Sequence, residues 1–334
     1  MPSGGKLPGE FELIARFFAP LATDTAALGL RDDAAVLMVS EGHELVVTCD
    51  TLVEGVHFLK DDPPDSIGHK ALAINLSDLA AKGARPCAYL LSLALPAETR
   101  PAWLDGFAAG LRGMQESCGI ALIGGDTTAS PGPLIITITA LGLVGHGHAV
   151  LRLGAKPGDK LYVSGTIGDA YLGLRLLKDA RLGRTWRLSK EDAGYLIDRY
   201  RRPGVRNDLI LLVRNFAQAA IDVSDGLVLD VEKLCEVSHI GAVIEAERAP
   251  LSAAARKVLN AEPALRAEII TAGDDYEVVA AIPENSAAAF ESEAEAKGAR
   301  FSLIGVLVSP EEGVTVIDGA GRPLKLKRKG FRHF

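Results

Sequence analysis

Aspartates stand beside the ends of short apolar segments along most of this 334-residue chain. Aspartate disfavours strands and is rarely buried without a partner, and carboxylates that a fold gathers repel one another. A bound cation relieves that repulsion, because Mg²⁺ prefers oxygen ligands and typically uses one or two carboxylates together with substrate phosphates. We therefore expect several Mg²⁺ ions and a polyphosphate. The segments contain Asp32-Asp33, Asp50, Asp78, Asp126, Asp222, Asp225 and Asp274-Asp275.

Each of these segments alone has an ordinary explanation. An aspartate beside a strand, as in Asp32-Asp33 or Asp225-Gly226, is usually a turn or helix-capping residue. Asp78 is less ordinary because it lies among leucines at helical spacing, where aspartate is disfavoured, although a solvent-facing position would also explain it. No EF-hand loop is present, which argues against a calcium-binding module. Gly124-Gly125 would let backbone N–H groups approach a phosphate closely.

Hydrophobic periodicity predicts a mixed α/β chain with two domains. Apolar residues at helical spacing indicate helices, and runs rich in Val, Ile and Thr indicate strands. A stretch rich in Gly, His and Pro, residues 145–158, favours a boundary near residue 150, so we expect domains at 1–150 and 151–334. The first contains predicted helices at 10–21, 66–82 and 101–117 and strands at 34–39, 44–49, 89–95, 121–123 and 134–144. The second contains predicted helices at 169–180, 189–199, 205–216, 226–237 and 285–297 and strands at 160–164, 219–223, 242–245, 277–282, 301–307 and 313–318.

Composition argues against several other classes of protein. Lysine and arginine number 36 against 43 aspartates and glutamates, and the net charge of −7 is opposite to that of a general nucleic-acid binder. The four cysteines form no CxxC pair, which argues against a disulfide scaffold or a zinc ribbon. No apolar run approaches the ~18–20 residues of a membrane helix, and no signal-peptide pattern is seen, so we expect a cytoplasmic protein without membrane or nucleic-acid partners. The P-loop, GxGxxG, GxSxG and HExxH motifs are absent.

An ordered set of motifs runs through the chain from residue 9 to residue 334. It comprises GEF with LIAR (9–16), DTLVEGVHF (50–58), NLSDLAA (75–81), GGDTT (124–128), GAKPGD (154–159), Arg202-Pro203, DVSDGL (222–227), GDDYE (273–277) and GFRHF (330–334). Each motif is modest, but their joint order is specific. Together they resemble the thiamine-monophosphate kinase family, which belongs to the superfamily of aminoimidazole ribonucleotide synthetase and selenophosphate synthetase.

The resemblance implies ATP-dependent phosphorylation of thiamine monophosphate to thiamine diphosphate by in-line phosphoryl transfer, assisted by several Mg²⁺ ions. It implies a two-domain aminoimidazole ribonucleotide synthetase-like α/β fold of α+β type. In that fold the N-terminal domain would bind ATP and Mg²⁺ and form a homodimer through its sheet, and the C-terminal α/β domain would close the cleft. Matching positions imply metal ligands at Asp33, Thr48, Asp50, Asp78, Asp126, Asp222 and Asp225, ATP contacts at Gly125, Asp126, Arg152 and Ser224, and substrate contacts at His57, Asp274 and Phe331.

The implied reaction needs no catalytic base. A phosphate monoester has a second pKa of about 6, so the acceptor is largely a dianion at pH 7. The obstacle is repulsion between two phosphate groups, which Mg²⁺ held by the aspartates would neutralise. His57 therefore fits a substrate contact better than a base, and Arg152 would add positive charge at the nucleotide phosphates.

Three residues depart from the family pattern. Arg31 stands where the family usually has Gly, and Cys49 stands where a hydroxyl residue is common. Asp274 replaces the usual Glu, which keeps the charge but shortens its reach by one methylene group. Selenophosphate synthetase is disfavoured because the first cysteine, Cys49, lies in a predicted strand, and aminoimidazole ribonucleotide synthetase because it lacks the GFxHF-like ending. A catalytically silent metal- or nucleotide-binding regulator on the same fold stays open, and only turnover decides against it.

Overall fold

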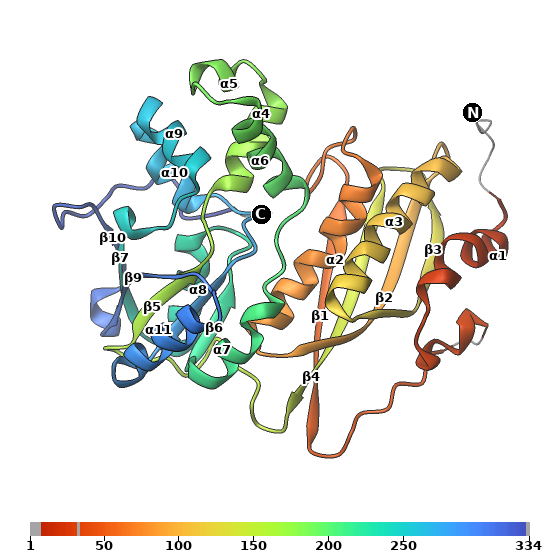
Figure 1. Cartoon of the computed structure of the whole chain (residues 1–334), viewed down its shortest axis with the longest axis horizontal. Coiled ribbons are helices and arrows are strands. Elements are labelled where there is room, and N and C mark those ends of the chain that lie inside the picture. Colours follow the sequence, from red (N-terminus) through yellow and green to blue (C-terminus); the bar gives the residue numbers. More distant parts are fainter. Residues whose placement is uncertain (1–7, 32–33, 332–334) are drawn as a thin grey trace. The chain divides into compact units, whose positions relative to one another are not determined.

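The structure is a computed structural model that describes residues 8–31 and 34–331. The chain forms two compact units, one of Met1–Leu79 with Ala84–Gly147 and the other of Ala80–Gly83 with His148–Phe334. Each unit contains a β-sheet with helices packed on it (Figure 1), which is how a two-faced sheet buries its apolar residues. Within the described residues, no helix is both long enough and apolar enough to cross a membrane.

The first unit is built on a four-stranded sheet of order β1-β4-β2-β3. Its strands are β1 (His43–Val53), β2 (Arg85–Pro96), β3 (Ala121–Ser130) and β4 (Ile135–Gly145). β2 and β3 run parallel, while β4 is antiparallel to both β1 and β2. Helices α2 (Pro64–Ala81) and α3 (Pro101–Cys118) pack against each other over one face of this sheet (Figure 1).

The alternation of side chains along β1 decides which residues face the helices. Gly142 of β4 pairs with Val46 of β1, and the Cβ position of Gly142 lies against Leu79 of α2. Since side chains alternate along a strand, Val46 and every second residue after it point toward the helices. Leu45 and Val47 point to the other face, where their side chains are 37% and 56% exposed.

The N-terminal segment differs in part from the sequence prediction. The helix predicted at 10–21 is present as α1 (Glu10–Leu13), a π-helical turn (Ile14–Phe18) and a 3₁₀ turn (Ala19–Leu21). The strand predicted at 34–39 is wrong, because the described residues there form no strand. Ala35 and Leu37 instead pack on a small cluster around Ala26 and Ile123. The alternating pattern therefore reflects packing over the sheet rather than pairing with a neighbouring strand.

The second unit is built on a six-stranded sheet of order β10-β7-β9-β5-β8-β6. Its strands are β5 (Lys160–Ser164), β6 (Ala219–Asp222), β7 (Gly241–Glu245), β8 (Val278–Ile282), β9 (Phe301–Val308) and β10 (Val314–Ile317). β10 and β7 are parallel, and the other neighbouring pairs are antiparallel. All six strands lie within two residues of the positions predicted from the sequence.

Helices bury both faces of this second sheet. Leu161 and Val163 of β5 belong to one apolar cluster, whereas Tyr162 between them belongs to another. The first cluster takes residues from α4 (Asp169–Lys178), α6 (Lys190–Arg201), α8 (Leu227–Ser238), α9 (Ala253–Ala261) and α10 (Arg266–Thr271). The second takes residues from α7 (Ile210–Phe216) and α11 (Ala287–Ala296). Helices α9, α10 and the single turn α5 (Leu182–Thr185) are additions to the sequence prediction.

Candidate active site

In the first unit, two of the predicted metal ligands are in direct contact. The Thr48 hydroxyl on β1 donates a hydrogen bond to Oδ2 of Asp78 on α2, at 2.5 Å. Asp78 is half-buried, between the fully buried residues Ser77 and Leu79. Asp50 lies two residues beyond Thr48 on the same face of β1. The donors on this face are hydroxyl and carboxylate oxygens, which are the ligand type that Mg²⁺ prefers.

Gly125 and Asp126 lie on β3, at the other edge of the sheet. Asp50 pairs with Ile138 of β4, which pairs with Leu91 of β2, and Leu91 in turn pairs with Gly125 of β3. Three strand spacings of ~4.8 Å therefore separate Asp50 from Gly125, or about 14 Å. One ion within this unit therefore cannot contact both Asp50 and Asp126. Among residues 8–31 and 34–331, no three His, Cys, Asp or Glu side chains gather closely enough to hold a metal.

Cys49, which departs from the family pattern, points to the face of the sheet away from α2. It is exposed, and the hydroxyl of Thr139 on β4 donates to its sulfur at 3.4 Å. Asp33, one of the predicted metal ligands, lies outside the described residues.

His57 lies in the turn that follows β1. The backbone N–H of Val53 donates to His57 Nδ1 at 3.0 Å, and the Lys70 ammonium group donates to the His57 carbonyl at 3.0 Å. Because Nδ1 accepts a hydrogen bond, the neutral ring carries its proton on Nε2. The imidazole can thus donate from Nε2 to a phosphate oxygen, as a substrate contact requires.

In the second unit, three of the motif segments come together. The backbone N–H of Asp274 donates to the carbonyl of Ser224 at 2.9 Å, and the N–H of Tyr276 donates to the carbonyl of Val223 at 2.8 Å. The N–H of Phe331, near the end of the chain, donates to the carbonyl of Asp225 at 2.9 Å. The predicted nucleotide contact Ser224 and the predicted substrate contacts Asp274 and Phe331 are therefore neighbours.

The loop that carries Asp274 has an unusual backbone. Asp274 and Tyr276 have φ values of 74° and 52°, in the left-handed region that most side chains avoid. The Tyr276 hydroxyl donates to Asp274 Oδ1 at 3.0 Å. Aspartate is enriched in this conformation because its short polar side chain bonds locally. The local backbone thus suits an aspartate at position 274.

Asp222 and Asp225 lie at the junction of β6 and α8. Asp222 is buried at the end of β6. Asp225 pairs with Lys233 at 2.6 Å, and the same ammonium group reaches Asp230 at 2.7 Å. The other carboxylate oxygen of Asp230 accepts the N–H groups of Asp225 and Gly226. The fold thus already holds a cationic group between two carboxylates at this point.

The sequence analysis did not predict Asp230 or Lys233 as site residues. Asp230 is fully buried, and burial raises its pKa against the opposing effect of Lys233. Burial works against the charge of Lys233 as well, but the two carboxylates hold its pKa above the usual value. The available signal was an aspartate in the apolar helical pattern around Val231, similar to that around Asp78.

Arg152 lies in the loop before β5. It is exposed, and its backbone carbonyl accepts a hydrogen bond from the Ser238 hydroxyl at 2.8 Å. This bond ties the loop to the end of α8, whose first turn follows Asp225. The contact orders the backbone at Arg152 and leaves the guanidinium group on the surface of the unit.

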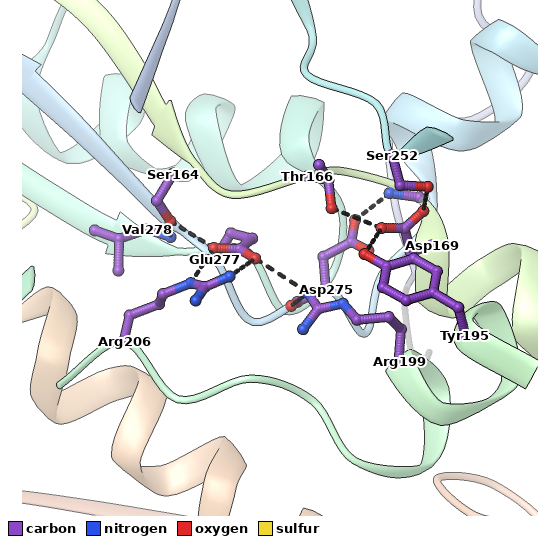
Figure 2. A network of polar contacts seen from close by, with 11 residues as sticks. Ser164, Thr166, Asp169, Tyr195, Arg199, Arg206, Ser252, Asp275, Glu277 and Val278 are labelled. Atoms are coloured by element: carbon purple, nitrogen blue, oxygen red, sulfur yellow. Dashed lines mark hydrogen bonds and ion pairs between the residues drawn. The ribbon is translucent and has the colours of Figure 1, made fainter. Parts of the chain in front are cut away.

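A buried polar network includes Asp275 and Glu277, which directly follow Asp274 in the chain (Figure 2). Its centre is Glu277, which is fully buried and accepts hydrogen bonds from Arg199 and Arg206. None of these three was predicted as a site residue. The signal in the sequence is the charged residue placed directly before the apolar strand that begins at Val278.

Asp275 is the next member of this network and is also fully buried. Its Oδ2 accepts the N–H of Gly168 at 2.7 Å, while its Oδ1 has no hydrogen-bond partner among the described residues. Burial raises the pKa of Asp275 well above its usual range, against the opposing effect of the Gly168 N–H. A carboxyl group with a raised folded-state pKa favours folding below its unfolded pKa and disfavours it as the pH rises through the folded pKa.

We expect the stability of an Asp275→Asn variant, relative to wild type, to rise as the pH is raised from 4 to 7. The amide is neutral throughout, so it lacks the charge that destabilises the folded wild type at higher pH, at about 1.4 kcal/mol per pKa unit. Urea unfolding at pH 4, 5.5 and 7 measures the difference.

Asp192→Asn is the matched control: its stability relative to wild type should change little between pH 4 and 7 and should rise as the pH falls below 4. Lys257 and then Ser189 lower the pKa of Asp192 to about 2. Its charge therefore stabilises the fold above the unfolded pKa, and that stabilisation is lost in acid. If the difference in unfolding free energy between Asp275→Asn and wild type does not change with pH, the raised pKa of Asp275 is wrong.

Comparisons with known proteins identify the family. The family models for AIR synthase related protein match residues 31–144 (N-terminal domain) and 156–318 (C-terminal domain). A thiamine-monophosphate kinase from Caulobacter vibrioides is 42% identical over 330 residues, which cover 98% of this chain and 91% of the relative. The crystal structure of thiamine-monophosphate kinase from Stenotrophomonas maltophilia K279a matches with a TM-score of 0.82 at 39% identity, covering 94% of this chain and 98% of that one.

A further solved structure is described as AaThiL complexed with AMPPCP and TMP. It matches with a TM-score of 0.76 at 29% identity and covers 89% of each chain. Together with the two sheets described above, these matches confirm the predicted two-domain α/β fold. The chain belongs to the thiamine-monophosphate kinase family, within the AIR synthase-related proteins.

Proposed function

We propose that this protein transfers the γ-phosphoryl group of ATP to thiamine monophosphate, giving thiamine diphosphate and ADP. One observation carries the proposal: a relative that covers 89% of this chain is described as complexed with AMPPCP and TMP. The chain itself supports it, because backbone hydrogen bonds join Asp274 to Ser224 and Phe331 to the next residue, Asp225, in the second unit.

The proposed site residues fall into three sets, which bind Mg²⁺, ATP and thiamine monophosphate. Mg²⁺, when bound, supplies positive charge that neutralises and aligns the phosphates. The hydroxyl–carboxylate pair of Thr48 and Asp78 fits this ion in ligand type. The remaining proposed ligands are Asp33, Asp50, Asp126, Asp222 and Asp225. Gly125, Asp126, Arg152 and Ser224 would contact ATP, and His57, Asp274 and Phe331 would contact thiamine monophosphate.

The chemistry requires no base from the protein. An oxygen of the acceptor phosphate, already largely deprotonated at pH 7, would attack the γ-phosphorus while the bond to the β-phosphate oxygen of the leaving ADP breaks. His57, with its proton on Nε2, would orient the acceptor by hydrogen bonding. The protein then contributes position and charge rather than proton transfer.

We further propose that the active form is a homodimer joined through the first sheet. Leu45 and Val47 expose apolar side chains on the sheet face away from the helices, which is typical of an interaction surface. Asp50 and Asp126 lie on opposite edge strands of that sheet, so only a second copy could bring these two positions of the first unit close together. Analytical ultracentrifugation tests this part, and a monomer at micromolar concentration would contradict it.

The test of the reaction is ADP release by the purified chain with ATP and Mg²⁺. Thiamine monophosphate, free thiamine and no acceptor are compared, and a parallel series contains excess EDTA. We expect ADP release with thiamine monophosphate only, and its loss in EDTA. Equal release without an acceptor would point to an ATPase, and no release under any condition would favour a silent binding protein.

A further inference from the structure

Glu277 forms the centre of a buried ionic cluster in the second unit (Figure 2). Arg206 donates two hydrogen bonds to it, from Nε at 2.6 Å and from Nη2 at 2.5 Å, and Arg199 donates one at 3.0 Å. The Ser164 hydroxyl donates to Glu277 at 2.6 Å and accepts the N–H of Val278 at 2.8 Å. The Glu277 side chain is fully buried, and those of Arg199 and Arg206 are 12% and 26% exposed.

The same cluster holds the backbone of the loop that carries Asp274. Arg199 also donates to the carbonyl of Asp275 at 3.2 Å, and the carbonyl of Glu277 accepts the N–H of Val223 at 2.7 Å. These bonds secure the middle of the loop to α6 and the residue after the loop to Val223, directly after β6.

The loop needs such support because of its conformation. Asp274 and Tyr276 both have positive φ, which aspartate tolerates better than the bulky Tyr276. Such a strained residue costs on the order of 1–3 kcal/mol and persists only where the surrounding structure enforces its conformation. A loop with that stored strain relaxes when its supports are weakened, and the Asp274 carboxylate would then move.

The cluster also gives the Arg202-Pro203 motif a structural context. Arg199 lies near the end of α6, Pro203 follows that helix, and Arg206 precedes the next helical turn. The segment from Arg199 to Arg206 connects α6 to the helical turn before α7. Glu277 binds this segment at both ends, through Arg199 and Arg206.

We propose that Arg199, Arg206 and Glu277 are positioning residues that hold the Asp274–Tyr276 loop in the conformation that binds the phosphate acceptor. None of the three needs to touch the acceptor. The proposal rests on the proposed function for its kinetic consequence, but its structural consequence, a loop protected from local opening, does not depend on the reaction.

Arg206→Lys tests the proposal. Lysine keeps the positive charge beside Glu277 but cannot form the two-pronged bond. We expect KM for thiamine monophosphate to rise about tenfold, with kcat and KM for ATP changed less than about twofold. Hydrogen exchange should be faster for peptides covering residues 272–278 than in wild type, because local opening becomes easier.

Arg181→Lys is the matched control. Arg181 also donates two hydrogen bonds to a carboxylate, that of Asp179 at 2.8 and 2.9 Å, but its side chain is 90% exposed. We expect no change in the kinetic constants or in exchange at 272–278. Ser164→Ala removes the hydroxyl that donates to the Glu277 carboxylate and accepts the Val278 N–H. It should change exchange and KM in the same direction as Arg206→Lys, and it keeps the test decisive if Arg206→Lys does not fold.

The outcomes separate this inference from the proposed function. Unchanged exchange at 272–278 in both variants would overturn the positioning role. Equal losses for both substrates together with a lowered melting temperature would also overturn it, because they would show general destabilisation. If the wild type fails to phosphorylate thiamine monophosphate, the proposed function fails, whereas the exchange comparison still decides whether the cluster holds the loop.

Discussion

Asp78→Asn will lower turnover at a fixed Mg²⁺ concentration by at least about a hundredfold, while the free energy of unfolding stays nearly unchanged. Replacing a residue that only orients a metal ligand typically costs about 10–100-fold, and removing the charge of a direct ligand should cost more. The fold should persist because the Asn carbonyl can still accept the Thr48 hydroxyl, which now donates at 2.5 Å. ADP release across a Mg²⁺ titration measures the first effect, and urea unfolding measures the second.

Asp105→Asn is the matched control for this prediction. Asp105 lies on α3 of the same unit and pairs with Arg16 at 3.3 Å, with both side chains more than half exposed. Exposed pairs of this kind contribute little to stability, and nothing places Asp105 near the proposed ligands. Turnover like that of wild type in Asp78→Asn would remove Asp78 from the metal site. Loss of turnover with an unfolded protein would show that its role is structural instead.

Asp78 shows what the sequence could reveal about this site. Its position among leucines at helical spacing is enough to single it out, and β1 brings a hydroxyl group to it. The order of strands was not available from the sequence. β4, the last strand of the unit in the chain, inserts beside β1, and this places Asp50 and Asp126 at opposite edges although both sit in similar motifs.

Residues paired over long sequence separations were equally hidden. Arg199 and Arg206 precede Glu277 by 78 and 71 residues, and nothing local links them. Short helices such as α10, with six residues, show too little periodicity to be recognised. The strand at 34–39 was wrongly predicted because its sequence does alternate between apolar and other residues. Its described residues nevertheless pair with no neighbouring strand. Sequence reasoning thus placed most helices and strands and singled out residues such as Asp78, and it failed where tertiary pairing decides.

Gly125→Ala will destabilise the first unit by about 3 kcal/mol, the upper end of the usual range for overpacking, and will lower turnover by at least about a hundredfold. Gly125 has a φ of 155°, and a Cβ atom there would lie 1.8 Å from the backbone carbonyl oxygen of Leu91 on β2. A backbone atom cannot rotate away, so β3 must shift from β2. A shift of about 1 Å in a binding group can cost a hundredfold in rate, and Asp126 is the next residue.

Gly113→Ala, in the same unit, should not destabilise the protein. Gly113 lies within α3, and a Cβ atom there would meet nothing within 4 Å. Alanine is favoured over glycine in helices by about 1 kcal/mol, so this variant should be slightly more stable than wild type and equally active. Thermal unfolding and ADP release of both variants make the comparison. If Gly125→Ala is as stable as Gly113→Ala, then Gly125 does not lie as close to the backbone of Leu91 as the structure shows. If Gly125→Ala is destabilised yet fully active, the phosphate-binding role of this edge of the sheet is wrong, because a displaced β3 could not then matter to ATP.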